Sequence, residues 1–365
     1  MRILLVQFIS TGGIQVYTSQ LANALSKTDH EVFVLLGDYL YDACYYDTQR
    51  VNLIKIKAAP SYFWMLRCLI NPKSHHQVAQ IISEIRPDVI HLMYDDIFTC
   101  LIAYRLRARY TIVYTDHDPV LHEGIPLASR LHHTITKLIT KRFDSIIVHG
   151  RQMEKVLINE GVAPDKVHVL PLGEFSIYNR WKNPTTTEEK SILFFGKIRK
   201  YKGIEYLIEA EPSITAAIPD AKIVIAGEGN FEEYMHLIKS KDNFELNIRH
   251  IPDEEVASFF QKASVVVLPY TGGSQSGVIP IAYSFGKPVV ATDVGSVAEV
   301  VEDGKTGFIV PPRDSIALAN AIIKIVNDDG LRYKMSENAY QKAQTELSWD
   351  SIAKKTAIIY QKARK

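Results

Sequence analysis

Cysteine is scarce in this chain of 365 residues: there are three, Cys44, Cys68 and Cys100, and they lie far apart. No Cys-x-x-Cys pair is present, which excludes the common cysteine-based zinc and redox motifs, so we expect reduced core thiols. An excess of one charge is also lacking, because 42 basic side chains balance 41 acidic ones. Nucleic-acid-binding proteins usually carry a basic excess on one face. The composition therefore argues against a nucleic-acid partner.

Long apolar runs are missing as well. No segment approaches the roughly 18 apolar residues that a membrane-spanning helix requires. The apolar run Ile3–Phe8 is too short for a signal peptide, and no small-residue cleavage site follows it. We interpret this run as a first β-strand and expect a cytoplasmic protein.

What the first half does contain is short β-branched runs that alternate with longer amphipathic stretches. This alternation is typical of a parallel sheet with helices on both faces. The predicted strands are Ile3–Phe8, Val32–Leu36, Val89–Met93, Thr111–Thr115, Ser145–Val148 and Val167–Leu170, and the predicted helices include Val16–Ser26, His76–Ile85 and Leu131–Arg142. Residues 1–173 are therefore predicted to form a doubly wound domain.

A polar, turn-rich segment then breaks the pattern and predicts a linker over residues 174–190. The second set of predicted strands is Ser191–Phe195, Ala221–Ala226, Leu246–Ile251, Ser264–Leu268, Pro288–Ala291 and Gly307–Val310, with helices at Ile204–Ala210, Glu254–Gln261 and Ile316–Val326. A chain of this length has room for two hydrophobic cores. The sequence thus predicts two doubly wound, Rossmann-like α/β domains, the second at residues 191–348, followed by a helix over 349–365.

Loops that follow parallel strands are where such domains bind ligands. Gly12 and Gly13 open a helix after the first strand, and the missing Cβ atoms let the backbone approach a phosphate closely. A tight strand-to-helix turn explains the same pair. A dinucleotide-binding fingerprint does not, because G-x-G-x-x-G is absent.

Two further loops in the second half have the chemistry of a diphosphate site. Between Lys197 and Lys202 there are four cations within six residues, directly before a predicted helix. A helix N-terminus also attracts negative charge, although a solvated basic turn is the alternative explanation. The segment Pro269–Val278 is rich in glycine and hydroxyl groups and leads into another helix, whose backbone N–H groups suit phosphate oxygens.

Taken in order, these motifs resemble glycosyltransferase family four, a large family of retaining GT-B glycosyltransferases. The resemblance covers nearly the whole chain. It rests on the glycine pair, His117-Asp118, the G-[RK]-x-x-x-x-K-G segment from Gly196 to Gly203, Gly227-Glu228-Gly229, the G-x-P-V-V-A run from Gly286 to Ala291, the G-x-x-x-E segment from Gly295 to Glu299, and the helix that starts at Trp349. It implies two domains facing each other across a cleft, with the last helix crossing back to the first domain.

The resemblance also implies roles for individual residues. Lys197 and Lys202 would neutralise the donor diphosphate, and His117 would lie beside the transferred sugar. Lys197 stands where many members have arginine, so the charge is kept but the bidentate fork is lost. The implied donor-binding positions are Gly12, Gly13, Gly196, Gly227, Gly229, Ile251, Ser276, Gly277, Val278 and Glu299. A surface histidine and a helix-start carboxylate are the alternatives for His117 and Glu299.

One departure from the family pattern concerns two glutamates that many members carry after the strand Ser264–Leu268. The corresponding positions here are Gly273 and Ile281, so neither carboxylate is present. We expect phosphate binding through Ser276, Gly277 and Val278 to persist, and the contacts to ribose and sugar to differ.

The implied reaction is transfer of a hexosyl or N-acetylhexosaminyl group from a UDP- or GDP-sugar to an acceptor hydroxyl with retention, in cell-surface polysaccharide or glycolipid assembly. No cofactor or metal is expected. Asp116-His117-Asp118 also spells D-x-D, a metal-binding signature of single-domain transferases, but two domains are predicted here. The rival interpretations are another GT-B enzyme, such as a nucleotide-sugar epimerase, and a non-catalytic protein that senses nucleotide sugars.

The acceptor is expected to be a glycan or a lipid-linked molecule bound by the first domain. The aromatic segment Pro60–Ile70, with Arg67 and Lys73 nearby, and the cations on another predicted helix would suit an anionic membrane. Those helix cations are Arg130, Lys137, Lys141 and Arg142. The protein would then be associated with the cytoplasmic face of the membrane, although ordinary core packing accounts for the same apolar residues.

Overall fold

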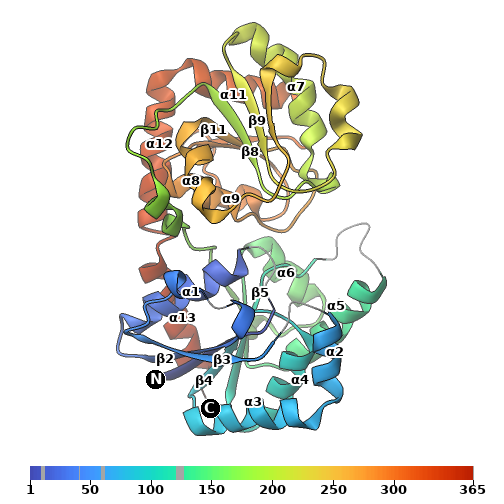
Figure 1. The fold of residues 1–365 in the computed structure, drawn as a ribbon, viewed down its shortest axis with the longest axis vertical. Helices are drawn as coiled ribbons and strands as arrows, with labels where there is room; N and C mark the ends of the chain where they lie inside the picture. Colours follow the sequence, from blue (N-terminus) through green and yellow to red (C-terminus); the bar gives the residue numbers. More distant parts are fainter. Residues whose placement is uncertain (10–12, 41, 59–61, 121–126, 365) are drawn as a thin grey trace. The chain divides into compact units, whose positions relative to one another are not determined.

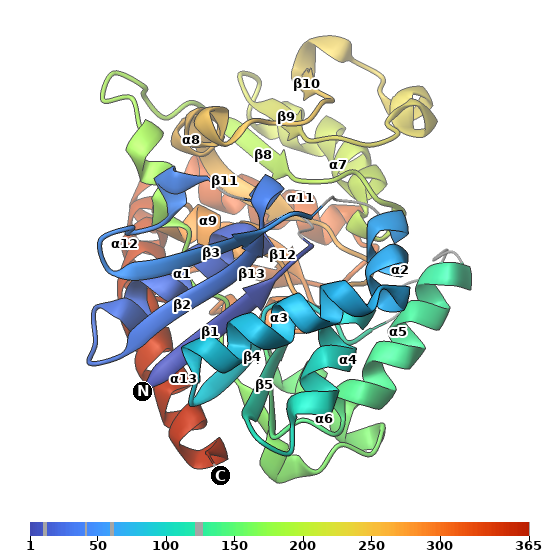
Figure 2. The same cartoon turned by 60° about the horizontal axis from the view of Figure 1, so that its bottom comes forward.

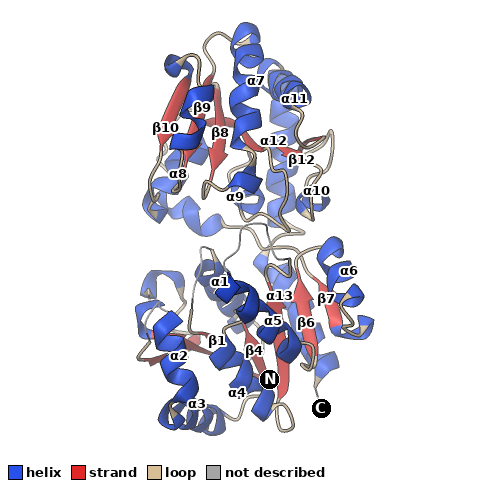
Figure 3. Ribbon diagram, turned by 90° about the vertical axis from the view of Figure 1, so that its right-hand side faces the viewer, coloured by secondary structure: helices blue, strands red, loops and turns tan. Residues whose placement is uncertain are grey.

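The structure is a computed structural model that describes residues 1–364 apart from 10–12, 41, 59–61 and 121–126. The chain divides into two compact units, residues 1–171 with 349–365, and residues 172–348. In each unit a layer of strands lies between helices (Figure 3). No helix of the described part is long and apolar enough to cross a membrane.

The first unit contains a seven-stranded parallel sheet in the order β3-β2-β1-β4-β5-β6-β7. Strands β2, β3, β4 and β5 of this sheet are labelled in Figure 1. Its strands are β1 (Arg2–Gln7), β2 (Glu31–Gly37), β3 (Val51–Ile56), β4 (Val89–Leu92), β5 (Thr111–Asp116), β6 (Ser145–Val148) and β7 (Val167–Val169). Its helices are α1 (Ile14–Ser26), α2 (Tyr62–Ile70), α3 (Pro72–Ile85), α4 (Ile97–Leu106), α5 (Leu127–Thr140), α6 (Arg151–Asn159) and α13 (Trp349–Ala363). The strand order reverses between β1 and β4. Ligands of such sheets bind beyond the carboxyl ends of the two strands at this position.

The core of the first unit follows from the alternation of side chains along the strands. Leu4 and Val6 of β1 pack in one cluster with Ile82 of α3 and Phe98 of α4. Figure 2 shows α3 running across the front of this sheet. Intervening residues such as Leu5 are fully buried on the opposite face, so both faces are covered, as a parallel sheet requires.

The closing helix α13 belongs to the first unit. It packs against α1, where the ring centroids of Tyr17 and Trp349 lie 5.0 Å apart. Apolar residues Ile352, Ile359 and Tyr360 are buried on one face of the helix. That face is what holds the end of the chain on the first sheet.

The second unit contains a six-stranded parallel sheet in the order β10-β9-β8-β11-β12-β13, which reverses between β8 and β11. The strands are β8 (Ser191–Phe195), β9 (Lys222–Ala226), β10 (Phe244–Asn247), β11 (Ala263–Leu268), β12 (Val289–Thr292) and β13 (Gly307–Val310). The helices are α7 (Ile204–Ala217), α8 (Asp253–Lys262), α9 (Val278–Ser284), α10 (Val297–Val300), α11 (Ser315–Asn327) and α12 (Asp329–Gln344).

Two elements differ from the sequence prediction. Strand β3 was not predicted, because Asn52 and Lys55 are exposed on this edge strand and weaken its apolar signal. Strand β10 ends at Asn247 rather than at Ile251, so Ile251 lies in the loop that follows it. It is also an edge strand, and the apolar pattern there is too sparse to define its limits.

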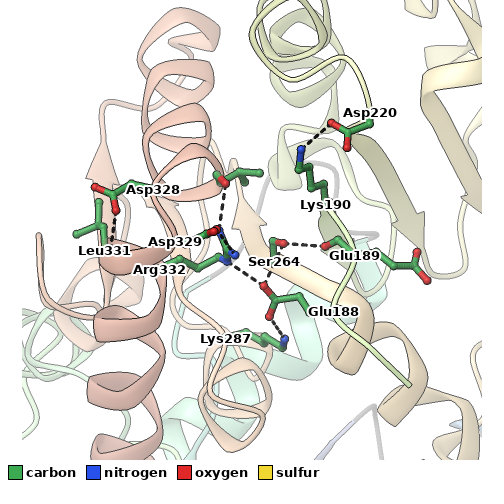
Figure 4. Close-up of polar contacts among 11 residues, drawn as sticks. Glu188, Glu189, Lys190, Asp220, Ser264, Lys287, Asp328, Asp329, Leu331 and Arg332 are labelled. Carbon is green, nitrogen blue, oxygen red and sulfur yellow. Dashed lines mark hydrogen bonds and ion pairs between the residues drawn. The ribbon is translucent and has the colours of Figure 1, made fainter. Parts of the chain in front are cut away.

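The segment over residues 174–190, which the sequence analysis assigns to a linker, folds as part of the second unit. It begins with a short 3-10 helix, Ser176–Trp181. Further along, the Glu188 carboxylate accepts hydrogen bonds from Lys287 Nζ at 2.5 Å and Arg332 Nε at 2.8 Å (Figure 4). Because Lys287 is buried, its charge needs this partner. The network holds the segment against α12.

Candidate active site

The strand order of the second sheet reverses between β8 and β11, and we call this position the switch point. The loops that leave these two strands lie against each other. Gly203 has a φ of +63°, and a Cβ on it would come within 2.0 Å of the Pro269 carbonyl oxygen. The backbone N–H of Thr271 donates to the Tyr201 carbonyl at 2.8 Å. Glycine at this position therefore allows the cation-rich loop to contact the hydroxyl-rich loop.

Lys202 lies where these two loops meet, and its Nζ donates a hydrogen bond to the Tyr270 hydroxyl at 2.5 Å. Nζ also lies 3.9 Å from the centroid of the Tyr270 ring. Burial lowers the pKa of Lys202 to about 8. Within the described residues no carboxylate forms an ion pair with it. The site thus holds a partly buried cation for which the described part of the chain provides no counter-ion.

The second predicted lysine, Lys197, has a different environment. Its Nζ lies 3.1 Å from Glu228, and both side chains are about half exposed. That hydrogen bond holds the pKa of the Glu228 carboxyl below its usual range. The pair borders a hollow of about 510 Å³ whose lining comes from the loops after β8 and β9. The lining residues are Lys197, Ile198, Arg199, Lys200, Glu228, Gly229, Asn230 and Glu233.

Close backbone contacts bring the predicted glycines of these loops together. A Cβ on Gly227 would lie 2.0 Å from the Gly196 carbonyl oxygen, and one on Gly229 would lie 2.6 Å from the Ile198 carbonyl oxygen. Gly196 also approaches α9, because its Cβ position is 3.8 Å from Val278. The structure therefore gathers Gly196, Gly227, Gly229 and Val278 at one edge of the second sheet.

The remaining donor-binding predictions fall on neighbouring loops. Glu299 follows β12, and its carboxylate accepts a hydrogen bond from Ser296 Oγ at 2.8 Å. The Ser296 N–H donates to the Ser274 carbonyl, which ties this loop to the one after β11. Gly277 directly precedes α9. Ile251 is buried in the loop after β10.

In the first unit, His117 follows β5 and is paired with a histidine that the sequence analysis did not identify. Its Nδ1 lies 3.0 Å from Nε2 of His149, whose Nδ1 lies 3.1 Å from the Leu170 carbonyl oxygen. A carbonyl only accepts, so His149 carries its proton on Nδ1 and accepts a hydrogen bond from His117. The pairing was readable from the sheet register, since both residues come directly after neighbouring strands.

Burial keeps this histidine pair uncharged. It lowers the pKa of His117 well below its ordinary value, although a hydrogen bond with the Met93 backbone opposes that shift, and it lowers the pKa of His149 to about 4. The Tyr17 ring packs edge-on against both imidazoles, with centroid distances of 4.9 and 5.3 Å. The pair carries no charge of its own at neutral pH, and His117 can only accept a hydrogen bond at Nε2.

Carboxyl groups lie at the ends of β4 and β5, near the histidine pair. Burial raises the pKa of Asp116 to about 8 and that of Asp95 to about 6. Thr136 of α5 donates to Asp95 at 2.9 Å. Within the described residues no group of three or more potential ligands is arranged to hold a metal ion.

The glycine pair after β1 is only partly observed. Gly12 lies outside the described residues, whereas Gly13 is exposed and its carbonyl accepts the Tyr17 N–H at 2.9 Å. Tyr17 is the residue of α1 that contacts His117. The start of α1 and the histidine pair thus share the carboxyl edge of the first sheet.

Comparison with known proteins decides the family. Residues 11–173 match the profile of Glycosyltransferase Family 4, and residues 177–342 match that of Glycosyl transferases group 1. The chain belongs to glycosyltransferase family four. It is a glycosyltransferase with the two Rossmann-like domains of the GT-B fold.

Two relatives of this family-four enzyme match it over nearly their whole length. A glycosyltransferase of Methanocaldococcus jannaschii is 26% identical, with 96% of this chain and 94% of that protein covered. A phosphatidyl-myo-inositol mannosyltransferase of Mycolicibacterium smegmatis is also 26% identical, with 96% and 90% covered. The solved structure of Anabaena HepE in complex with UDP-glucose has a TM-score of 0.74 at 19% identity, covering 99% of this chain and 100% of that one.

The two positions at which this family-four enzyme lacks glutamates have distinct structural settings. Gly273 has a φ of +122°, and its Cβ position is 3.4 Å from the Tyr201 ring, so the backbone there suits glycine. Ile281 is buried within α9. A carboxylate at either position would need a different local structure.

Proposed function

We propose that this glycosyltransferase transfers a hexosyl or N-acetylhexosaminyl group from a nucleoside-diphosphate sugar to an acceptor hydroxyl, with retention at the anomeric carbon. The observation that carries the proposal is Lys202, a partly buried cation with no carboxylate partner among the described residues, at the switch point of the second sheet. Burying a charge costs free energy unless an opposite charge compensates it. A diphosphate supplies that charge. The complex of the similar HepE with UDP-glucose supports a uridine nucleotide as one candidate donor.

In the proposed reaction the bond between the anomeric carbon and the diphosphate oxygen breaks as the acceptor oxygen bonds to the same face of that carbon. The acceptor proton passes to the leaving phosphate. Lys202, Lys197 and the backbone N–H groups of the loop after β11 stabilise the negative charge that develops on the diphosphate. The family resemblance assigns to His117 the contact with the transferred sugar.

The acceptor in this proposal is a glycan or a lipid-linked molecule, and the enzyme reaches it from the surface of an anionic membrane. Leu127, Leu131 and Leu138 of α5 are 81%, 60% and 63% exposed. Their spacing of four and seven residues puts them on one face of the helix. The helix contains no acidic residue, and Arg130 on it and Arg142 after it are exposed. An apolar stripe with flanking cations suits an anionic bilayer.

The aromatic segment of α2 contributes less to this surface than its sequence indicates. The Trp64 ring packs against Phe8 and Phe98 with centroid distances of 6.3 and 6.2 Å, and Cys68 is buried. Ile70, at the end of α2, is 85% exposed. We therefore assign the membrane surface mainly to α5.

A flotation assay tests the membrane part of the proposal. Wild-type protein should float with vesicles that contain phosphatidylglycerol and remain in solution with pure phosphatidylcholine vesicles. The variant with Leu131→Ser and Leu138→Ser should lose most of the flotation. Ile316→Ser removes an equally exposed apolar side chain from the second unit and should float normally. Wild-type protein that never floats would contradict this part.

A donor screen tests the enzymatic part. UDP-, GDP- and ADP-sugars are each added to wild-type protein, and binding is followed by thermal shift. One nucleotide class should stabilise the fold in proportion to its affinity. Nuclear magnetic resonance of the product formed with a simple glycoside acceptor then reports the anomeric configuration, and inversion would contradict the retaining mechanism.

A further inference from the structure

A chain of three hydrogen-bonding side chains joins the two loops at the switch point of the second sheet. Lys202 Nζ, which can only donate, bonds to the Tyr270 oxygen at 2.5 Å. The Tyr270 hydroxyl lies 3.0 Å from Ser276 Oγ, which also accepts the Val278 N–H at 3.3 Å. Tyr270 is therefore the link between the lysine of one loop and the serine of the other.

Tyr270 is fixed in place by its surroundings. It is 1% exposed and follows β11 directly, and its carbonyl accepts a hydrogen bond from Thr292 Oγ1 at 2.6 Å. Its ring lies beneath Lys202 Nζ, while the Tyr201 ring lies 5.6 Å from the same nitrogen. The ammonium group thus lies near two nearly perpendicular aromatic rings, and aromatic faces attract cations.

The directions of these hydrogen bonds leave donors for a ligand. A buried tyrosine hydroxyl must donate its own hydrogen, and within the described residues Ser276 Oγ is the acceptor in reach. Ser276 Oγ then accepts hydrogen bonds from Tyr270 and Val278, so the Ser276 hydroxyl hydrogen is not used among these three side chains. One hydrogen of Lys202 goes to Tyr270, which leaves two. The groups of these side chains that remain available to a ligand, on Ser276 and Lys202, are donors. Donors suit phosphate oxygens.

We propose that Tyr270 is the positioning residue of the donor site, which holds Lys202 and Ser276 in place for the diphosphate of the nucleotide sugar. This inference rests on the proposed function. Tyr270 does not itself contact the ligand in this account, since its oxygen and its hydrogen are both used within the chain. It acts by fixing two donors on separate loops before the ligand arrives, so that little ordering is needed on binding.

Replacing the hydroxyl while keeping the ring tests the proposal. Tyr270→Phe is compared with wild type by titration calorimetry with UDP, GDP and ADP and with the corresponding monophosphates. For the diphosphate that wild type binds, the affinity should fall about tenfold, in line with the loss of a hydrogen bond to a charged group. The affinity for its monophosphate should change less than twofold, because the outer phosphate is absent.

A matched control separates positioning from general damage to the fold. Tyr283 is another fully buried tyrosine of the same unit, and its hydroxyl lies 2.7 Å from Thr306 Oγ1. Tyr283→Phe removes a comparable buried hydrogen bond and should lower the thermal midpoint as much as Tyr270→Phe does. Its affinity for the diphosphate should equal that of wild type.

A double-mutant cycle tests the link to Ser276. If Tyr270 acts partly through Ser276, the effects of Tyr270→Phe and Ser276→Ala on diphosphate affinity should not multiply in the double variant. Multiplying effects, wild-type affinity in Tyr270→Phe, or an equal loss in Tyr283→Phe would each overturn the inference and leave the proposed function standing. Wild-type protein that binds none of the three diphosphates would overturn the proposed function as well.

Discussion

Nδ1 of His117 lies 3.0 Å from Nε2 of His149, and the far nitrogen of His149 bonds to the Leu170 carbonyl. Two uncharged imidazoles, His149 buried and His117 partly buried, therefore form a directed hydrogen-bond chain that ends on the backbone. The chain fixes the tautomer and the ring orientation of His117, the residue to which the family resemblance assigns the transferred sugar. With its proton on Nδ1, His117 can only accept a hydrogen bond at Nε2 from a ligand that meets it.

Removal of the His149 acceptor should therefore reduce turnover. In His149→Phe the ring volume is kept, but the His149 acceptor for Nδ1 of His117 is lost, so we expect kcat to fall about tenfold or more while the KM for the donor changes little. Steady-state kinetics with the identified donor measures this. His168→Phe alters a partly buried histidine on β7 and should leave kcat unchanged. An unchanged kcat in His149→Phe would mean that the pair is only structural.

Donor binding should weaken as the pH rises through the pKa of Lys202, which burial lowers to about 8. The diphosphate binds the protonated lysine, so above that pH the free protein must first take up a proton, and the affinity should fall by about tenfold per pH unit at most. Calorimetry between pH 7 and pH 9 measures the slope. Lys202→Arg stays charged throughout this range and should show a flat profile. A flat wild-type profile would contradict the assignment.

The close approach of the two loops predicts a large cost for a side chain at Gly203. In Gly203→Ala the Cβ would meet the Pro269 carbonyl oxygen at 2.0 Å, in addition to the strain of a φ of +63°. We expect a loss of about 3 kcal/mol or more in the free energy of unfolding of the second unit. Gly161→Ala has a φ of +90° with no atom within 4 Å, so it isolates the backbone strain and should cost only about 1 kcal/mol. Urea unfolding curves compare the two, and equal costs would show that the loops can move apart.

Metal removal should leave the reaction intact. In this account Lys202, Lys197 and backbone N–H groups supply the positive charge that a divalent cation supplies in other transferases. Dialysis against EDTA, followed by an assay in metal-free buffer, should give the untreated rate within about twofold. Full loss of activity, restored by magnesium or manganese, would show that the charge comes from a metal instead.

Much of the fold could be predicted because buried parallel strands read as apolar runs. Strands β1, β8 and β11 and the loops that leave them were predicted within a residue or two, since both of their faces are covered. The edge strands β3 and β10 carry exposed polar residues, so β3 was missed and β10 was misplaced. The segment 174–190 read as a linker because its attachment to the second unit depends on Glu188 contacts that are distant in sequence.

For the candidate site, the sequence pointed to loops and to single residues, but not to the hydrogen-bond partners of those residues. Family motifs identified Lys202 and His117, but not their partners Tyr270 and His149. A hydrogen-bond partner is determined by the packing of separate loops, which a motif does not encode. Ser276 was expected to contribute backbone N–H groups, and the structure adds its hydroxyl to the network.

The central claim is that the partly buried charge of Lys202 holds the donor diphosphate, and slow donor hydrolysis tests it most directly. Wild-type protein, incubated without acceptor, should release the nucleoside diphosphate from one class of nucleotide sugar. Lys202→Ala should reduce that release at least a hundredfold, whereas Lys190→Ala, which removes a surface ion pair with Asp220, should have no effect. Release that persists unchanged in Lys202→Ala would contradict the account.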